Sequence, residues 1–350
     1  MPWPALSFGE GAAQSLTRGL QIIFELRGAS SCALTFWLML PLENGSSEGE
    51  RVAMELKTVQ AGVLEIAVEM SGPETGPVAI LLHGFPDDVR VWDGVAPELA
   101  AQGFRVLVPY LRGYGPTRFR DSATPRSGEQ AALGADLLAL MDALAIPKAI
   151  LAGYDWGGRA ACVVSALWPE RVIGLVSVNG YNIQDIAGSI RPATPAQEAR
   201  HWYQWYLQTD RGAAGLAENR RELCELLWRL WSPNMGFTAE SYAKTAASFD
   251  NPDFVAVAVH SYRHRHRAVA GDPAYAAIEA RLATRPIITV PSLVLHGAED
   301  GVDPPSNSAG CARHFTQLLA RKVVPISGHF LPRESPAEIL AAIHLLVSTN

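Results

Sequence analysis

The chain has 350 residues, which is enough for one large α/β domain with an insertion or for two modest domains. Its formal net charge is -6 and it contains no long basic run, so we expect neither nucleic acid nor an anionic membrane surface as a partner. The cysteines are scattered and lack the C-x-x-C spacing of metal sites, which predicts reduced thiols in a cytoplasmic protein; they are Cys32, Cys162, Cys224 and Cys311.

Residues 1–53 are predicted to be an extension outside the catalytic fold. The longest apolar stretch near the N-terminus, Ala33 to Leu42, is shorter than the ~20 residues that cross a bilayer, and it starts too far from Met1 for a signal peptide. The polar run 44–50 resembles a solvated linker, and the segment that begins at Met54 resembles the start of an ordinary domain.

Alternating strand and helix patterns predict a mostly parallel sheet with right-handed crossovers. The expected strands are 63–70, 77–82, 105–108, 149–152, 171–179, 291–295 and 322–326, and the expected helices of the core are 127–144, 159–167, 308–319 and 336–347. Residues 182–285 lack strand runs and are expected to form an inserted helical cap between core segments 54–181 and 286–350. The cap tryptophans are expected to pack in its core; they are Trp202, Trp205, Trp228 and Trp231.

The most informative motif follows the apolar run 149–152. Gly153-Tyr154-Asp155-Trp156-Gly157-Gly158 places small residues on both sides of Asp155, at the point where a predicted strand turns into a helix. This is the pattern of the nucleophile elbow of α/β-hydrolases. A carboxylate with an ordinary pKa of ~3.9 is anionic at neutral pH, so Asp155 could attack an electrophilic carbon without a base. The plain alternative is that Asp155 caps the following helix.

Three further motifs supply partners for this aspartate. His83-Gly84-Phe85-Pro86 follows a buried strand and predicts an oxyanion hole from the backbone N–H groups of Phe85 and Trp156. Asp300 follows the strand at 291–295 and is the expected acid, with Glu299 and Asp303 as rivals. His329 follows the last strand and is the expected base. His260, His264 and His266 could suggest a metal site, but no acid or cysteine cluster adjoins them, so we expect an exposed helix face.

From about residue 55 to the end, the chain resembles the epoxide hydrolases of the α/β-hydrolase superfamily. The resemblance rests on the His83, Asp155, Asp300 and His329 motifs and on Arg112-Gly113-Tyr114-Gly115. It implies an α/β-hydrolase fold with an inserted cap and hydrolysis of a small-molecule epoxide by water, without a metal or organic cofactor. It also implies that two cap tyrosines hold the epoxide oxygen. Matching segments are Tyr203-Gln204-Trp205-Tyr206 and Ser261-Tyr262-Arg263, so these roles pass to Tyr203 and Tyr262.

Two alternatives stay open. Haloalkane and haloacetate dehalogenases share the elbow, but the chain lacks their halide donors: Phe85 replaces the usual Asn of the former, and Trp156 and Tyr203-Gln204 replace an Arg and a His-Trp pair of the latter. A catalytically silent protein that binds a small ligand is the second alternative. Tyr154 stands where epoxide hydrolases usually have His, which puts the substrate range in question. The expected partners are the epoxide, water and a second copy of the chain in a homodimer.

Overall fold

A computed structural model describes residues 54–349 of the chain. The predicted extension 1–53, with Cys32, lies outside the described residues. The described strands form one sheet in the order β1-β2-β4-β3-β6-β7-β8-β9, with β5 beside β2. The strands are β1 (Glu55–Ala61), β2 (Leu64–Ser71), β3 (Val78–Leu82), β4 (Arg105–Pro109), β5 (Arg118–Phe119), β6 (Ala149–Gly153), β7 (Val172–Val178), β8 (Ser292–Gly297) and β9 (Leu318–Val324).

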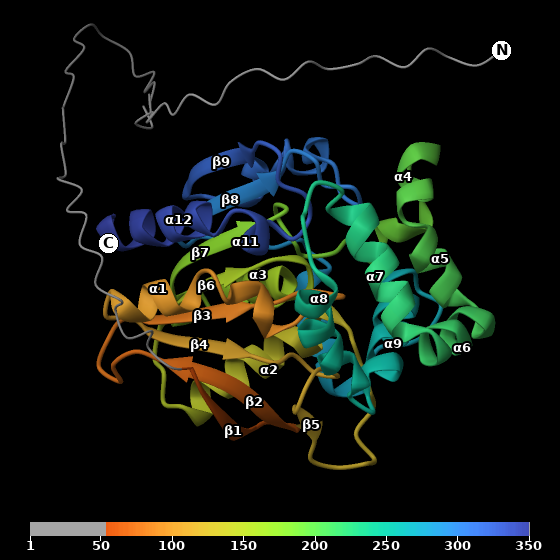
Figure 1. Cartoon of the computed structure of the whole chain (residues 1–350), viewed down its shortest axis with the longest axis horizontal. Coiled ribbons are helices and arrows are strands. Elements are labelled where there is room, and N and C mark those ends of the chain that lie inside the picture. Colours follow the sequence, from red (N-terminus) through yellow and green to blue (C-terminus); the bar gives the residue numbers. More distant parts are fainter. Residues whose placement is uncertain (1–53, 350) are drawn as a thin grey trace, which may run out of the picture. The chain divides into compact units, whose positions relative to one another are not determined.

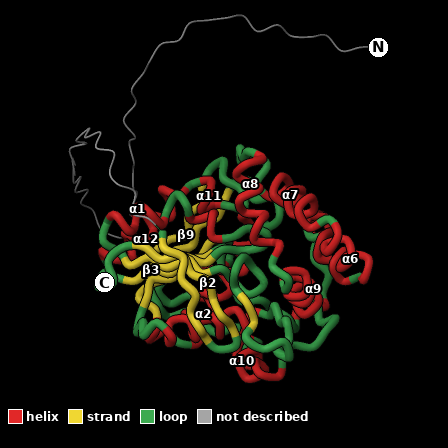
Figure 2. Tube along the Cα trace, turned by 60° about the horizontal axis from the view of Figure 1, so that its bottom comes forward, coloured by secondary structure: helices red, strands yellow, loops and turns green. Residues whose placement is uncertain are grey.

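The central strands are parallel, and β2 pairs antiparallel with β1, β4 and β5 at one edge. Strand β6 is buried along its whole length, as its apolar sequence requires in a sheet covered on both faces. Helices α1 and α12 lie on one face and α2 on the other (Figure 2). The expected mostly parallel sheet flanked by helices is therefore confirmed. The helices outside the β7–β8 connection are α1 (Ala96–Ala101), α2 (Gln130–Ala143), α3 (Asp155–Leu167), α11 (Leu331–Glu334) and α12 (Pro336–Ser348).

The connection between β7 and β8 is helical. Its helices lie largely to the right of the sheet in Figure 1, beyond the carboxyl ends of the parallel strands. Short polar caps start several of them: the Thr194 hydroxyl accepts a hydrogen bond from the N–H of Gln197, and Thr238 forms a capping box with Ser241. We call this set the cap helices; they are α4 (Pro195–Arg200), α5 (Trp202–Gln208), α6 (Asp210–Glu218), α7 (Arg220–Trp231), α8 (Ala239–Ala246), α9 (Phe254–Arg265) and α10 (Ala276–Leu282).

The sequence misassigned one segment and missed others, among them α1, β1 and β5. The helix predicted over 308–319 is wrong: two short 3-10 turns, Pro305–Ser308 and Cys311–His314, lead directly into β9. The N–H of Thr316 donates to the carbonyl of Ile288, so pairing with a distant segment replaces the local helix. Strand β1 was not predicted because most of its side chains face solvent and it carries no apolar run.

Candidate active site

The turn from β6 into α3 holds Asp155 in a strained backbone conformation. Its φ is 48°, in the left-handed region that few residues other than glycine adopt. The turn is also tightly enclosed: a Cβ at Gly157 would lie 2.2 Å from the carbonyl oxygen of Leu82, and one at Gly84 would lie 2.6 Å from the Cβ of Asp155. The small residues are therefore required by close backbone approach, and the Asp155 side chain is presented at the carboxyl edge of the sheet.

Each carboxylate oxygen of Asp155 has a different partner. Oδ1 accepts a hydrogen bond from the backbone N–H of Phe85 at 2.8 Å. Oδ2 lies 3.3 Å from Nη2 of Arg159, one helical turn further along α3. Trp156 is buried and its ring stacks on Phe85 with centroids 5.6 Å apart. The structure thus brings the His83-Gly84-Phe85-Pro86 turn and the elbow together around one carboxylate.

His329 lies in the loop after β9 and is oriented by Asp300. Its Nδ1–H donates to Oδ2 of Asp300 at 2.9 Å. Burial lowers the pKa of His329, but the charge of Asp300, this hydrogen bond and the charge of Asp155 outweigh that effect, and together they raise the pKa to about 9. The Nε2 atom of His329 is buried and has no hydrogen-bond partner within residues 54–349, so it is the nitrogen that can meet a water molecule.

The rivals of Asp300 have other surroundings. Glu299 is exposed, and a carboxylate oxygen of Asp303 lies 3.6 Å from His201. Asp300 accepts hydrogen bonds from three donors besides His329: Oδ2 also accepts from Nδ2 of Asn179 at 2.7 Å, and Oδ1 accepts from the backbone N–H groups of Val302 and Asp303. These bonds fix the carboxylate toward His329.

The two cap tyrosines lie over the turn at residues 83–86. Tyr203 on α5 and Tyr262 on α9 contact each other, with ring centroids 5.2 Å apart, and both rings contact Phe85. Burial raises the pKa of both phenols above the ordinary value, so each stays a proton donor at neutral pH. The Tyr262 hydroxyl is buried and has no hydrogen-bond partner in the described part of the chain.

The Tyr203 hydroxyl is part of a short hydrogen-bonded chain. Nε2 of Gln204 donates to it at 2.9 Å, and Oε1 of Gln204 contacts Nε2 of His266 at 2.8 Å. Because Gln204 supplies a donor, the phenolic proton of Tyr203 is left for another acceptor.

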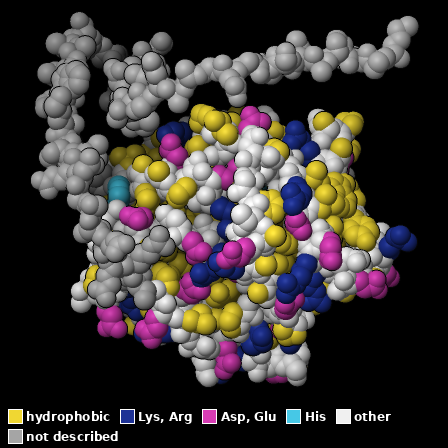
Figure 3. Space-filling model, viewed as in Figure 1, with side chains coloured by type: hydrophobic (Ala, Val, Ile, Leu, Met, Phe, Trp, Pro, Cys, Tyr) yellow, Lys and Arg dark blue, Asp and Glu magenta, His cyan; other side chains and the backbone are white. Residues whose placement is uncertain are grey.

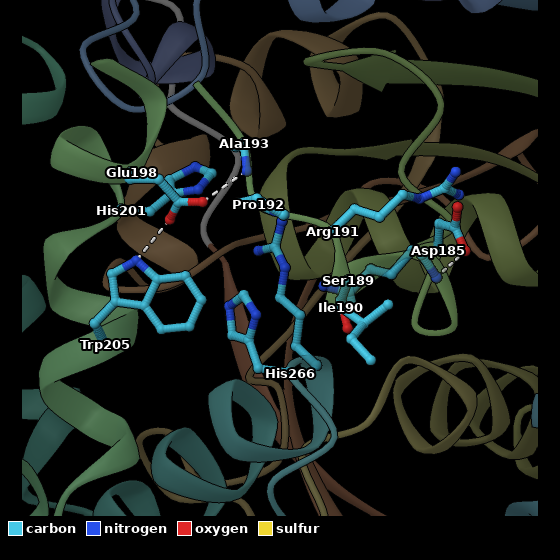
Figure 4. A pocket seen from close by; sticks show the side chains of 13 residues that line it. Asp185, Ser189, Ile190, Arg191, Pro192, Ala193, Glu198, His201, Trp205 and His266 are labelled. Carbon is cyan, nitrogen blue, oxygen red and sulfur yellow. Dashed lines mark hydrogen bonds between the residues drawn. The ribbon is translucent and has the colours of Figure 1, made fainter. Parts of the chain in front are cut away.

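His266 lines a cavity of about 540 Å³ between α5 and the loop that precedes α4. At this cavity Glu198 accepts hydrogen bonds from the indole N–H of Trp205 and from the backbone N–H of Ala193 (Figure 4).

The expectation that three histidines form an exposed helix face is wrong. His260, His264 and His266 are half-buried, and Glu129 and Glu279 lie close to His264. Among residues 54–349 these three groups, Glu129, His264 and Glu279, are the set whose ligand atoms, within 4.8 Å of one another, could hold a metal ion. Both carboxylates already accept hydrogen bonds, Glu129 from Ser127 and Glu279 from the N–H of Ala131, and His264 lies 3.6 Å from Glu129. Glu129 directly precedes α2, so the group joins this end of α2 to α9 and α10.

The expectation for the tryptophans needs one correction. Trp228 and Trp231 are buried in the cap as expected, whereas Trp205 is 41% exposed.

On the face of the molecule drawn in Figure 3, basic and acidic side chains are interspersed and form no continuous basic surface. No helix within the described range is both long and apolar enough to cross a membrane.

Sequence reasoning missed three residues that touch the expected site. Arg159 contacts Asp155, Asn179 contacts Asp300 and Gln204 contacts Tyr203. The spacing of Arg159 from Asp155 carried a signal, because residues four apart on a helix lie on one face. Nothing in the sequence pointed to Asn179, which reaches Asp300 across 121 positions.

Comparison with known proteins supplies the family. The model of the "alpha/beta hydrolase fold" matches residues 77–336. A crystal structure of a candidate epoxide hydrolase from Klebsiella pneumoniae subsp. pneumoniae is 43% identical, with a TM-score of 0.82, and the match covers 83% of this chain and 97% of that one. Epoxide hydrolase B of Mycobacterium tuberculosis is 32% identical over 42% of this chain and 44% of its own length. Bifunctional epoxide hydrolase 2 of Mus musculus is 37% identical over 35% and 21%. The matches thus span less than half of these two curated relatives.

Proposed function

Because the chain belongs to the α/β-hydrolase superfamily and, within it, to the epoxide hydrolase family, we propose that it hydrolyses a small-molecule epoxide to a vicinal diol. The observation that carries this proposal is the pair of buried cap tyrosines beside the Asp155 turn, one with its hydroxyl unpartnered within the described residues and the other with its proton left free by Gln204. Such donors suit an alkoxide leaving group, which is too basic to depart without a hydrogen bond or a proton.

In the first step, Asp155 attacks an epoxide carbon. The bond from that carbon to the ring oxygen breaks, its electron pair stays on the oxygen, and a phenolic proton from Tyr203 or Tyr262 neutralises the alkoxide. The product is an alkyl ester of Asp155. Formation of the ester removes the negative charge of Asp155, which is one of the charges that raise the pKa of His329. His329 therefore becomes easier to deprotonate when its function as a base is needed.

In the second step, His329 takes a proton from water, and the resulting hydroxide attacks the ester carbonyl carbon of Asp155. The N–H groups of Phe85 and Trp156 stabilise the oxyanion. The tetrahedral intermediate collapses, the C–O bond to the diol breaks, and protonated His329 gives its proton to the departing oxygen. Asp155 is left as a carboxylic acid that carries the second proton of the water. This proton passes to the tyrosinate formed in the first step, which restores both the Asp155 carboxylate and the tyrosine. Asp300 holds His329 in position and stabilises its charged form.

Replacement of the nucleophile tests this proposal. Asp155→Ala removes the attacking atom, so diol formation is expected to fall by at least ~1000-fold, as it does when other covalent nucleophiles are removed. The measurement is diol release from an epoxide that the parent protein hydrolyses, with the thermal transition of both proteins compared to show that the variant folds. Full activity of Asp155→Ala would refute the assignment.

The cellular setting is a separate proposal. Cys162, Cys224 and Cys311 form no disulfide, which supports a reducing compartment such as the cytoplasm. The substrate and water are the small-molecule partners, and a homodimer is the assembly that we propose for the chain, to be measured by light scattering.

A further inference from the structure

Arg159 is a cation in the reaction centre that the mechanism above does not use. Its side chain is 7% exposed, and its Nη2 atom lies 3.3 Å from Oδ2 of Asp155. The guanidinium carbon lies 6.0 Å from the centre of the Trp156 ring, and its charge also acts on the Tyr262 phenol. Arg159 therefore contacts the proposed nucleophile, and its charge acts on one of the two tyrosines proposed to donate to the epoxide oxygen.

The guanidinium of Arg159 is poorly satisfied for a buried arginine. Within residues 54–349, its one hydrogen-bonding partner is Asp155. Arg112, also buried, shows what full satisfaction requires in this chain: a two-point ion pair with Asp136 and further bonds to the Ser127 carbonyl and the Tyr275 hydroxyl. An arginine carries five N–H donors in a planar fork. Most donors of Arg159 are thus available to a ligand.

The proposed reaction would remove the one partner that Arg159 has. When Asp155 becomes an ester it loses its charge, and Arg159 is left as a buried cation without a counter-charge. An uncompensated buried charge is costly. A substrate that brings an anionic group of its own would offset this cost throughout the reaction, and a carboxylate matches the fork of a guanidinium with two parallel hydrogen bonds.

We infer that the preferred substrates are epoxides that carry a carboxylate next to the ring, the 2,3-epoxy acids, and that Arg159 binds this carboxylate. The carboxylate is placed beside the ring because Arg159 contacts the attacking side chain itself, so an anion bound there lies within a few ångströms of the attacked carbon. This inference rests on the proposed function and adds the substrate class to it.

The test compares 3-phenylglycidate with its neutral isostere 3-phenylglycidamide. The parent protein is expected to favour the acid by about 10- to 100-fold in kcat/KM, the range for one charge-assisted hydrogen-bonded pair. Arg159→Met is expected to lose this preference, mainly through a higher KM for the acid, and Arg159→Lys to keep part of it. Since Arg159 also touches Asp155, the ratio of the two substrates is the readout, and absolute rates are not.

A matched control separates local recognition from net charge. Arg211 is exposed on α6, and its side chain makes no hydrogen bond or ion pair within residues 54–349. Arg211→Met makes the same change of charge and is expected to leave the ratio unchanged. Equal use of acid and amide by the parent, or an equal loss for both in Arg159→Met, would overturn the inference and leave epoxide hydrolysis standing. Failure of the parent to form an Asp155 ester with any epoxide would instead contradict the proposed function.

Discussion

His329 lies between two carboxylates that have different fates in the proposed reaction. Asp300 keeps its charge throughout, while Asp155 is neutral once it is an ester. Both charges raise the pKa of His329, against the effect of burial, which lowers it. The same side chain is thus held as a cation before alkylation and is released toward the neutral form after it.

The rate of ester hydrolysis is therefore expected to rise with pH. Below its pKa, which is raised to about 9 in the free protein, His329 is protonated and cannot accept a proton from water. The rate should therefore increase through the neutral range and reach a plateau at high pH. Its midpoint should lie below about 9, because the ester lacks the charge of Asp155 that helps to raise this pKa. Single-turnover decay of the ester between about pH 6 and 10 measures this. Asp300→Asn removes a charge that raises the pKa and should move the midpoint to lower pH. A rate that falls as pH rises would be incompatible with His329 as the base.

At the scale of single elements, the turn between β6 and α3 depends on a close approach of backbones. Gly157 faces the carbonyl oxygen of Leu82, which belongs to β3 and cannot move without disturbing the sheet. The turn therefore allows no side chain at this position, and it holds Asp155 against the strand that leads into residues 83–86.

Gly157→Ala is expected to destabilise the protein by about 2 kcal/mol or more, because the added Cβ would overlap backbone atoms. Urea denaturation measures the free energy of unfolding. Gly236→Ala is the matched control: a Cβ there meets no atom within 4 Å, so its stability should stay within about 0.5 kcal/mol of the parent. Equal stability of the two variants would show that the turn is not tightly packed.

The sequence predicted those elements whose signal is local. The apolar run of β6 indicates a buried strand, and the small residues around Asp155 indicate a tight turn. His83-Gly84-Phe85-Pro86 likewise indicates the end of its strand from a few neighbouring residues. The segment 308–319 failed because its backbone pairs with Ile288, which local propensity does not register. The cap tyrosines came from the family resemblance, since their position over Phe85 depends on how α5 and α9 pack.

Across the whole molecule, the cap helices are bound to the loops that carry the proposed site. The indole N–H of Trp228 donates to the carbonyl of Pro86 at 2.6 Å. The carbonyl of Trp231 accepts from the N–H groups of Gly301 and His329. One cap helix, α7, thereby contacts the turn at residues 83–86, the loop that carries Asp300 and the loop that carries His329. We expect this closure to limit the access of water, which strengthens the electrostatic interactions within.

The same closure joins groups far apart in the sequence into one two-step site. Asp155, Asp300 and His329 come from the core, and Tyr203 and Tyr262 from the cap. The glutamates that flank His264 add a second link between α2 and the cap helices. The five residues could be selected from the sequence, whereas the contacts between them depend on how segments distant in the chain pack against one another.

The most direct test is intact mass spectrometry of the His329→Gln variant after incubation with a panel of neutral and acidic epoxides, and separately with haloalkanes and haloacetates. Without its base the second step should stop, so the account predicts a protein heavier by the whole mass of an epoxide, with the adduct on Asp155. An adduct equal to a halide substrate minus its halide would place the reaction among the dehalogenases. The absence of any adduct, with the variant folded, would contradict covalent catalysis by Asp155 and favour a ligand-binding protein.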